Sequence, residues 1–132
     1  RELVKDGLEA FKKTYGRGLG SGGSVANQEL VGPVAGRFTS MHNFWIEILV
    51  EGGALVFALG STFLISLVFN LFIIARSNLN GSIKYLSQSL FLSLAAFIPA
   101  AIAASSTIYF FPMWILFGLS ISVIDLSNKK LA

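Results

Sequence analysis

The sequence predicts an all-α protein with three transmembrane spans, preceded by part of a large external loop that contains an amphipathic helix. Two observations lead to this fold class. The 132 residues are 54% hydrophobic and only 13% charged, with a mean hydropathy of +0.70, whereas soluble domains carry about 25% charged residues. The charges are also unevenly placed, because only five of them fall in residues 53–132. This pattern excludes a disordered chain and divides the protein into an external segment, 1–52, and a membrane segment, 53–132.

Composition also excludes several functional classes. The chain has no cysteine and a single histidine, so it cannot form a disulfide framework, a thiolate metal site or a multi-histidine zinc site. We therefore expect no metal and no cofactor. The net charge of +3 does not form a basic patch on a foldable soluble surface, which argues against nucleic acid as a partner.

Three uncharged runs account for the membrane segment: 53–75, 86–104 and 108–124. The first, at 1.5 Å per residue, is about 34 Å long, and the hydrocarbon core of a bilayer is about 30 Å thick. The second and third are separated only by residues 105–107. A single helix across both would be longer than a bilayer is thick, so we expect a helical hairpin with its turn at 105–107.

The basic residues predict the orientation of these spans. Arg76 and Lys84 flank the connection between the first two spans, and Lys129 and Lys130 follow the third. Short cytoplasmic loops are enriched in Lys and Arg, so this side should be cytoplasmic and residues 1–52 should face outward.

Polar residues inside the spans are few, and we expect them to make helix contacts rather than carry chemistry: Asn70, Gln88, Ser89 and Ser93. No charged residue lies in the middle of a span, so a proton relay or an ion pathway lacks its expected groups.

Within the external segment, residues 2–15 have the pattern of an amphipathic helix that ends at Gly16. We expect it to lie against the membrane surface or the membrane domain. Its apolar stripe consists of Val4, Leu8, Phe11 and Tyr15.

A glycine-rich stretch follows, at residues 16–24. Gly18, Gly20 and Gly23 fit the pattern G-x-G-x-x-G, but a dinucleotide site needs a strand before it, and here a helix precedes. Two interpretations stay open: a plain turn, or a turn whose backbone N–H groups hold phosphate oxygens beside Arg17.

A second helix is predicted to start near Ser40, with Asn43 in its first turn and a bend at Gly52-Gly53 into the first span. Glu47 and Glu51 share a helix face with Asn43. From the spacing alone, His42 is either a structural or a catalytic histidine. Arg37 alone could be an interface residue whose guanidinium reaches toward water.

Together these residues resemble a known family. The sequence has the stretch Gly18-Leu19-Gly20-Ser21-Gly22, about twenty loop residues, and then the element His42-Asn43, nine residues, Gly53. This arrangement resembles the O-antigen ligase-like family, which includes O-antigen ligases and Wzy-type polysaccharide polymerases. Arg1, at the start of the first helix, is similar to the arginine that opens the large external loop of that family. The chain would correspond to the C-terminal third of such a protein.

The resemblance implies a glycosyltransferase in the bacterial cytoplasmic membrane. It would move a glycan from an undecaprenyl diphosphate carrier onto a sugar acceptor outside that membrane. Arg37 and Arg1 would neutralise the diphosphate, without a metal, and His42 would accept the proton of the acceptor hydroxyl or bind the diphosphate. Arg17, Asn43 and Glu47 would line the substrate site. Ligase and polymerase both remain open.

Two other classes are also open. The first is a non-catalytic transporter or flippase fragment of a polysaccharide export system, which would have charged or broken helices at the membrane midplane. The second is a structural or assembly subunit whose loop is a binding surface.

Overall fold

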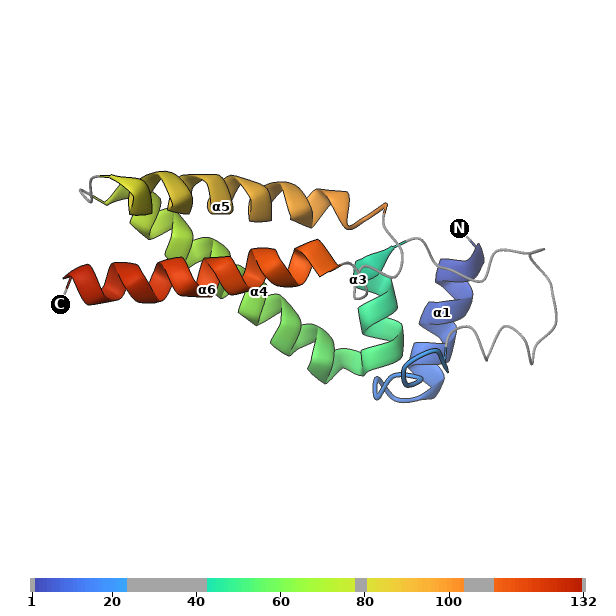
Figure 1. Ribbon diagram of the computed structural model, residues 1–132. Helices are drawn as coiled ribbons and strands as arrows, with labels where there is room; N and C mark the ends of the chain where they lie inside the picture. Colours follow the sequence, from blue (N-terminus) through green and yellow to red (C-terminus); the bar gives the residue numbers. More distant parts are fainter. Residues whose placement is uncertain (1, 24–42, 78–80, 104–110, 132) are drawn as a thin grey trace. The chain divides into compact units, whose positions relative to one another are not determined.

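The computed structural model describes residues 2–23, 43–77, 81–103 and 111–131, and in these ranges the chain forms helices and turns and no strand. The predicted all-helical class is confirmed for this part of the chain. The predicted turn at 105–107 lies outside the described residues. The helices are α1 (Glu2–Lys13), α3 (Phe44–Glu47), η1 (Ile48–Gly52), α4 (Gly53–Arg76), α5 (Ser82–Ala100) and α6 (Phe111–Leu131) (Figure 1).

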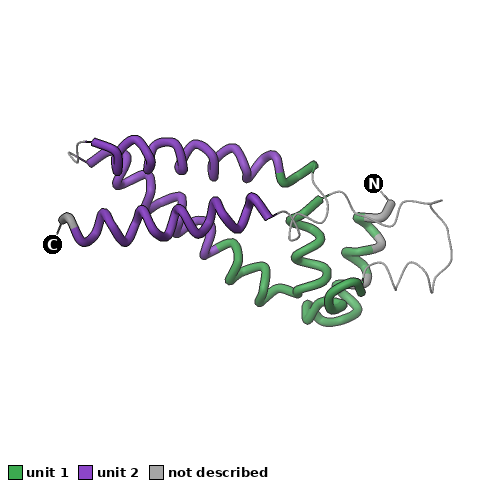
Figure 2. The backbone as a smooth tube through the Cα atoms, in the orientation of Figure 1, with its two compact units in different colours: residues 1–61, 101–107 green, residues 62–100, 108–132 purple. Residues whose placement is uncertain are grey.

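The chain forms two compact units (Figure 2). Unit 1 comprises residues 1–61 and 101–107, and unit 2 comprises residues 62–100 and 108–132. The division falls inside α4, so the first turns of this helix belong to unit 1 and the rest to unit 2.

Within the described residues, three helical runs are long and apolar enough to cross a membrane: Phe44–Arg76, Ser82–Ala100 and Phe111–Lys129. Their bounds differ from the predicted ones. The second helix begins four residues before residue 86 and ends four before residue 104. The third begins at Phe111 and continues past residue 124 to Leu131. Hydropathy marks only the apolar part of a helix, whereas backbone hydrogen bonds extend it through polar residues such as Ser82 and Asn128.

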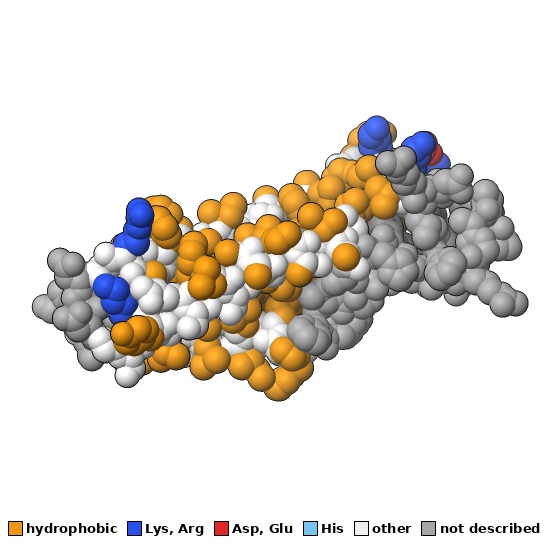
Figure 3. Space-filling view, turned by 90° about the horizontal axis from the view of Figure 1, so that it is seen from above, with side chains coloured by type: hydrophobic (Ala, Val, Ile, Leu, Met, Phe, Trp, Pro, Cys, Tyr) orange, Lys and Arg blue, Asp and Glu red, His pale blue; other side chains and the backbone are white. Residues whose placement is uncertain are grey.

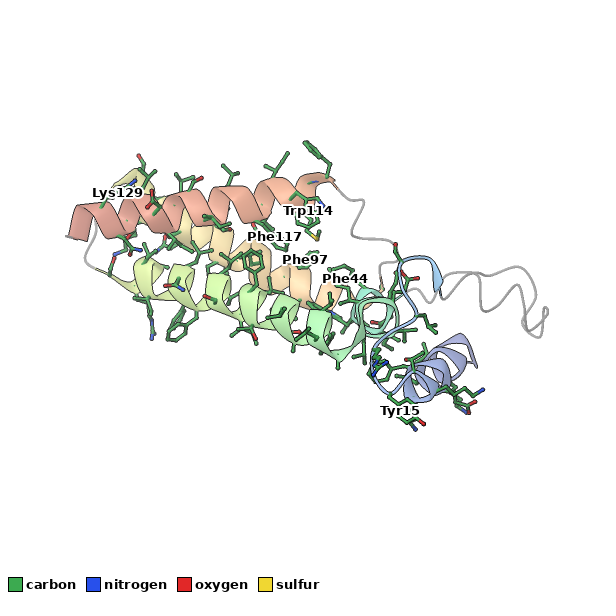
Figure 4. The ribbon with its side chains drawn as sticks, turned by 90° about the horizontal axis from the view of Figure 1, so that it is seen from below. Tyr15, Phe44, Phe97, Trp114, Phe117 and Lys129 are labelled. Carbon is green, nitrogen blue, oxygen red and sulfur yellow. The ribbon has the colours of Figure 1, made fainter. Side chains whose placement is uncertain are left out.

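Unit 2 is held together by one narrow face of each helix. On α4 this face repeats at helical spacing, and on α5 and α6 it includes serines, whose small size allows helices to approach closely. The Phe117 ring lies 5.6 Å from that of Phe63 and 6.2 Å from that of Phe97, both nearly edge to face (Figure 4). The buried residues are Leu64, Leu67, Leu71, Ile74, Ser87, Leu90, Leu94, Met113, Ser120, Val123 and Ser127.

The outer faces of these helices carry large apolar side chains. Leu59, Ile65, Phe69, Leu92 and Leu126 are each more than half exposed. Hydrophobic side chains cover much of this surface (Figure 3). The basic residues of unit 2 include Arg76 in the last turn of α4, Lys84 in the first turn of α5 and Lys129 near the end of α6. An apolar band of this kind suits contact with lipid rather than water.

The polar residues of unit 2 show two kinds of bonding. Gln88 reaches another helix, since its Nε2 donates to the carbonyl oxygen of Ala75 at 3.5 Å. Asn70 and Ser93 bond to their own helix, through the carbonyls of Ser66 and Ser89 at 2.8 Å. Interhelical bonding by a polar residue is therefore seen at Gln88. Three serines that were not predicted to make helix contacts lie on the packing faces: Ser87, Ser120 and Ser127.

In unit 1, α1 packs against η1, and Val50 of η1 is fully buried. The prediction that Tyr15 continues the apolar stripe of this helix is wrong. The helix ends at Lys13, and Tyr15 has the left-handed backbone angle φ of 53° with 94% of its side chain exposed. Gly16 closes the helix, because its N–H donates to the carbonyl of Phe11 at 3.1 Å. The left-handed conformation of Tyr15 costs about 1–2 kcal/mol, because residues other than glycine are unfavourable there.

The predicted bend at Gly52-Gly53 is confirmed. After the single turn of α3, the chain forms the short π-helix η1, and Gly53 then adopts φ 82° and ψ 175°. This combination is restricted almost entirely to glycine. The helical run from Phe44 to Arg76 is consequently divided, and the chain turns sharply between η1 and α4 (Figure 1).

The glycine-rich stretch fits directly onto this bend. Leu19 N donates to Val50 O at 2.8 Å and Gly20 N to Glu51 O at 3.0 Å, while Ala54 N donates to Gly16 O at 2.9 Å. These bonds cross the junction in both directions and satisfy backbone groups that the end of η1 and the start of α4 would leave unpaired.

Gly18 and Gly53 make this contact possible, because each lies against the backbone of the other segment. A Cβ at Gly53 would lie 2.6 Å from the carbonyl carbon of Arg17, and a Cβ at Gly18 would lie 2.5 Å from Gly53 N. Backbone atoms cannot move aside as a flexible side chain can, so neither position has room for a larger residue.

We predict that Gly53→Ala and Gly18→Ala each lower the apparent melting temperature of the protein in detergent, because both combine a backbone clash with a positive φ. The positive φ alone should cost about 1–3 kcal/mol. Fluorescence-detected size-exclusion chromatography after heating would measure this. Gly60→Ala is the matched control: it lies inside α4 with nothing within 4 Å of its Cβ, and it should be neutral or slightly stabilising. Equal melting of Gly53→Ala and Gly60→Ala would contradict the prediction.

Candidate functional site

Three of the predicted site residues, Arg17, Asn43 and Glu47, lie in the described part of unit 1. Arg1, Arg37 and His42 lie outside the described residues. The described parts of the region are the helix start after His42 and the turn that carries Arg17.

Asn43 is the N-cap of α3. Its backbone is extended, with φ −153° and ψ 102°, and its Oδ1 accepts hydrogen bonds from Trp45 N at 3.1 Å and Ile46 N at 3.2 Å. The prediction that Asn43 lies inside the first turn of a helix starting near Ser40 is thus wrong. An asparagine Oδ1 can replace the missing helical acceptors of the first turn, which makes Asn43 a strong start signal.

The first N–H of α3 also has an acceptor. Phe44 N donates to the carbonyl of Ala101, the residue after α5, at 3.1 Å, and the Phe44 side chain is 7% exposed. Glu47 N donates to Asn43 O at 2.9 Å. Since the leading N–H groups of this short helix are all used within the chain, α3 does not present them to an anion.

The turn at residues 16–23 uses its backbone in the same way. Besides the bonds to η1, Arg17 N donates to Thr14 O at 3.1 Å, Gly22 N to a Glu51 carboxylate oxygen at 3.2 Å and Gly23 N to Gly20 O at 3.0 Å. The N–H groups of these residues, which a phosphate-binding turn would need, are occupied. Of the two interpretations of the glycine-rich stretch, the structure favours a turn that binds its own chain.

The two carboxylates of this helical segment are Glu47 in α3 and Glu51 in η1. The Glu51 carboxylate holds the turn through Gly22, across 29 residues of sequence, so it has a structural task. Glu47 is half-buried in α3, one helical turn after the cap. Glu47 is the carboxylate of α3, and the sequence resemblance assigns it to the substrate site.

Arg17 occupies the junction between the turn and the membrane helix. Its carbonyl group faces Gly53, and the residue as a whole is exposed. The N–H groups of Gly16, Arg17 and Leu19 are engaged within the chain, and the exposed Arg17 guanidinium is a side chain that can bind an anion.

Comparison with family models, with curated proteins and with solved structures finds no match for this chain. The interpretation of the site therefore depends on the residues and their geometry.

Two features of this region were not predicted from the sequence. One is the π-helix η1, and the other is the pairing of Gly18 with Gly53. A weak signal for the second was present, since a glycine pair at 52–53 and a glycine at every second position from 16 to 22 both indicate unusual backbone geometry. Nothing in the sequence showed that the two would meet.

We predict that Asn43→Ala lowers the stability of the protein by about 1 kcal/mol, because two first-turn N–H groups lose their acceptor. Asn43→Asp and Asn43→Ser retain an acceptor oxygen and should melt close to the wild-type temperature. The apparent melting temperatures of the three variants test this. If Asn43→Asp melts as low as Asn43→Ala, Asn43 is not acting as a cap.

Proposed function

We propose that the protein is a membrane glycosyltransferase of the O-antigen ligase or polymerase type. It transfers or polymerises a glycan from an undecaprenyl diphosphate carrier onto a sugar acceptor outside the bacterial cytoplasmic membrane. The proposal rests on the motif His42-Asn43, nine residues, Gly53, and on the chemistry of the arginines near it.

One observation carries the proposal: the nine residues between Asn43 and Gly53 coincide with one helical segment. Residues 44–52 comprise the four residues of α3 and the five residues of η1. This segment is bounded by the N-cap Asn43 and by the bend at Gly53. Both boundary residues are required by geometry, because Asn43 accepts two N–H bonds and Gly53 has no room for a Cβ. The nine-residue spacing of the motif thus equals the combined length of α3 and η1. The third fixed motif position, His42, is the proposed chemical group, because an imidazole can accept a proton near neutral pH.

The proposed reaction is a displacement at the anomeric carbon of the carrier-linked sugar. The acceptor hydroxyl oxygen forms a bond to that carbon, and the bond from the carbon to the diphosphate oxygen breaks, leaving its electron pair on the diphosphate. His42 accepts the hydroxyl proton. Arg37 and Arg1 bind the diphosphate, whose negative charge grows as it leaves, and guanidinium groups pair well with phosphate oxygens. Arg17, Asn43 and Glu47 contact the substrates.

The engagement of the backbone N–H groups supports this assignment of roles. Neither the start of α3 nor the glycine-rich turn offers free N–H groups to a diphosphate at the residues described above. In this proposal arginine side chains neutralise the leaving group, and the motif region supplies them.

We predict that His42→Ala and Arg37→Ala each abolish glycan transfer while the protein stays in the membrane. Transfer is measured as glycan chain length and carrier-linked intermediates in extracts of cells that express each variant. Lys5→Ala is the matched control, since Lys5 is an exposed basic residue of α1 with no proposed role, and it should leave transfer unchanged. Asn43→Asp adds a further test: it keeps the cap, so a loss of transfer in a stable protein would show that the amide contacts substrate.

Normal transfer by both His42→Ala and Arg37→Ala would overturn the proposal. A protein that moves carrier-linked glycan across the membrane without extending it would instead indicate the flippase alternative. In that case unpolymerised intermediates would accumulate on the inner side when the gene is absent.

We also predict the orientation of the chain, with Arg76, Lys84 and Lys129 on the cytoplasmic side and residues 1–52 outside. The absence of cysteine makes single cysteines specific reporters. In intact cells a membrane-impermeant maleimide should label Ser21→Cys, whereas Asn128→Cys, exposed at the end of α6, should react only after permeabilisation. The reverse pattern of labelling would contradict the proposed side of the reaction.

A further inference from the structure

We propose that the turn after α1 is an interfacial anchor that binds anionic lipid headgroups, through Lys12, Lys13, Tyr15 and Arg17. This proposal requires that α4 crosses a membrane, but it does not depend on glycosyl transfer. It also goes beyond the expectation that α1 lies against the membrane surface or the membrane domain. The lipid contact is placed in the turn after the helix, while α1 itself packs against η1.

The first argument is the position of the turn along the membrane axis. The 24 residues of α4 span about 36 Å, and the hydrocarbon core is about 30 Å thick, so the start of the helix lies within about 3 Å of the core boundary. Apolar side chains are exposed from its first turn, with Leu55 at 72% and Val56 at 51%. Ala54 N donates to Gly16 O at 2.9 Å, which ties the turn to this level. Residues 15–17 therefore lie in the headgroup zone.

The second argument is the conformation of Tyr15. Its φ of 53° is unfavourable for a residue with a side chain, and a glycine there would avoid the strain. Its side chain is 94% exposed and stands out from the end of α1 (Figure 4), so packing within the described structure does not offset the strain. Tyrosine favours the membrane–water boundary, where its ring meets apolar groups and its hydroxyl meets water. A headgroup layer is thus a partner that explains an exposed tyrosine here.

The third argument is charge. Lys12, Lys13 and Arg17 flank Tyr15 and are exposed, and within the described residues the structure records no ion pair to any of them. Among the carboxylates of unit 1, Glu9 is exposed in α1, and Glu51 accepts a hydrogen bond from Gly22 N. A short segment with three cations around one tyrosine is complementary to phosphate groups of an anionic lipid surface.

The test uses the full chain in lipid nanodiscs, with a nitroxide attached to Tyr15→Cys as the only cysteine. Collision rates with oxygen and with a water-soluble nickel complex report the depth of the label. The discs contain phosphatidylcholine, either alone or with about one third phosphatidylglycerol. A label at Gly118→Cys, in α6, marks the hydrocarbon, and one at Lys5→Cys gives a reference near the start of α1.

We expect the label at residue 15 to lie at headgroup depth in the anionic discs and to be more accessible to nickel in the neutral discs. Lys12→Gln, Lys13→Gln and Arg17→Gln together should remove this difference, with each cation contributing about a fivefold change in the equilibrium between bound and aqueous positions. An aqueous label in both lipids would overturn the proposal. A label of equal depth in both lipids, unaffected by the triple substitution, would also overturn it. The proposal would likewise be overturned if the label were protected from the nickel complex only when a lipid diphosphate is added.

A second measurement separates the role of Tyr15 from its effect on folding. Tyr15→Gly relieves the left-handed strain, so it should raise the apparent melting temperature in detergent. In anionic nanodiscs this gain should disappear or reverse, because the variant loses its contact with the headgroups. The same gain in both environments would show that Tyr15 makes no lipid contact.

Discussion

The contact between Gly18 and Gly53 is the constraint on which the rest of unit 1 depends. Two backbones meet there without intervening side chains, and the hydrogen bonds of Leu19, Gly20 and Ala54 close the contact on both sides. The left-handed φ at Gly53 turns the chain from η1 into α4, so the contact also determines where the membrane helix begins. Any larger residue at either glycine would force the turn away from the bend and leave the paired N–H and carbonyl groups without partners.

This constraint changes how the glycine-rich stretch is understood. Glycines beside an arginine suggest a phosphate-binding turn. Here Gly18 allows close backbone approach, and the N–H groups of Gly16, Gly20, Gly22 and Gly23 are used by the protein. The same holds for Asn43, whose amide oxygen starts α3. The backbone of the region is thus a scaffold, and the proposed reaction depends on side chains: His42, Arg37 and Arg1, with Arg17 and Glu47 as proposed substrate contacts. A rigid scaffold is what a displacement at a bound sugar needs, since small errors in orientation slow such reactions strongly.

The apolar helices of unit 2 are stabilised differently from unit 1. They bury only narrow faces, centred on Leu71 and Leu94 and on small serines, and expose broad apolar ones. In water this arrangement would be poorly stable, whereas in lipid the exposed faces need no protein partner and helix contacts depend on close packing and on bonds such as that of Gln88. Tyr15 and its neighbouring cations would then mark the level at which the chain passes from lipid to water.

The sequence by itself determined the helical class, the three long apolar helices and the bend at Gly52-Gly53. These features follow from local properties: hydropathy over a window, backbone freedom at glycine and the absence of mid-span charge. Only the tertiary structure decided that η1 is a π-helix, that Gly18 packs on Gly53, that Ser87, Ser120 and Ser127 lie on packing faces, and that Tyr15 is exposed beyond the end of α1. Each of these depends on contacts between residues distant in the chain, or on where a helix stops. Hydrophobic periodicity carries no information on either, because it reports which face is apolar and not what that face meets.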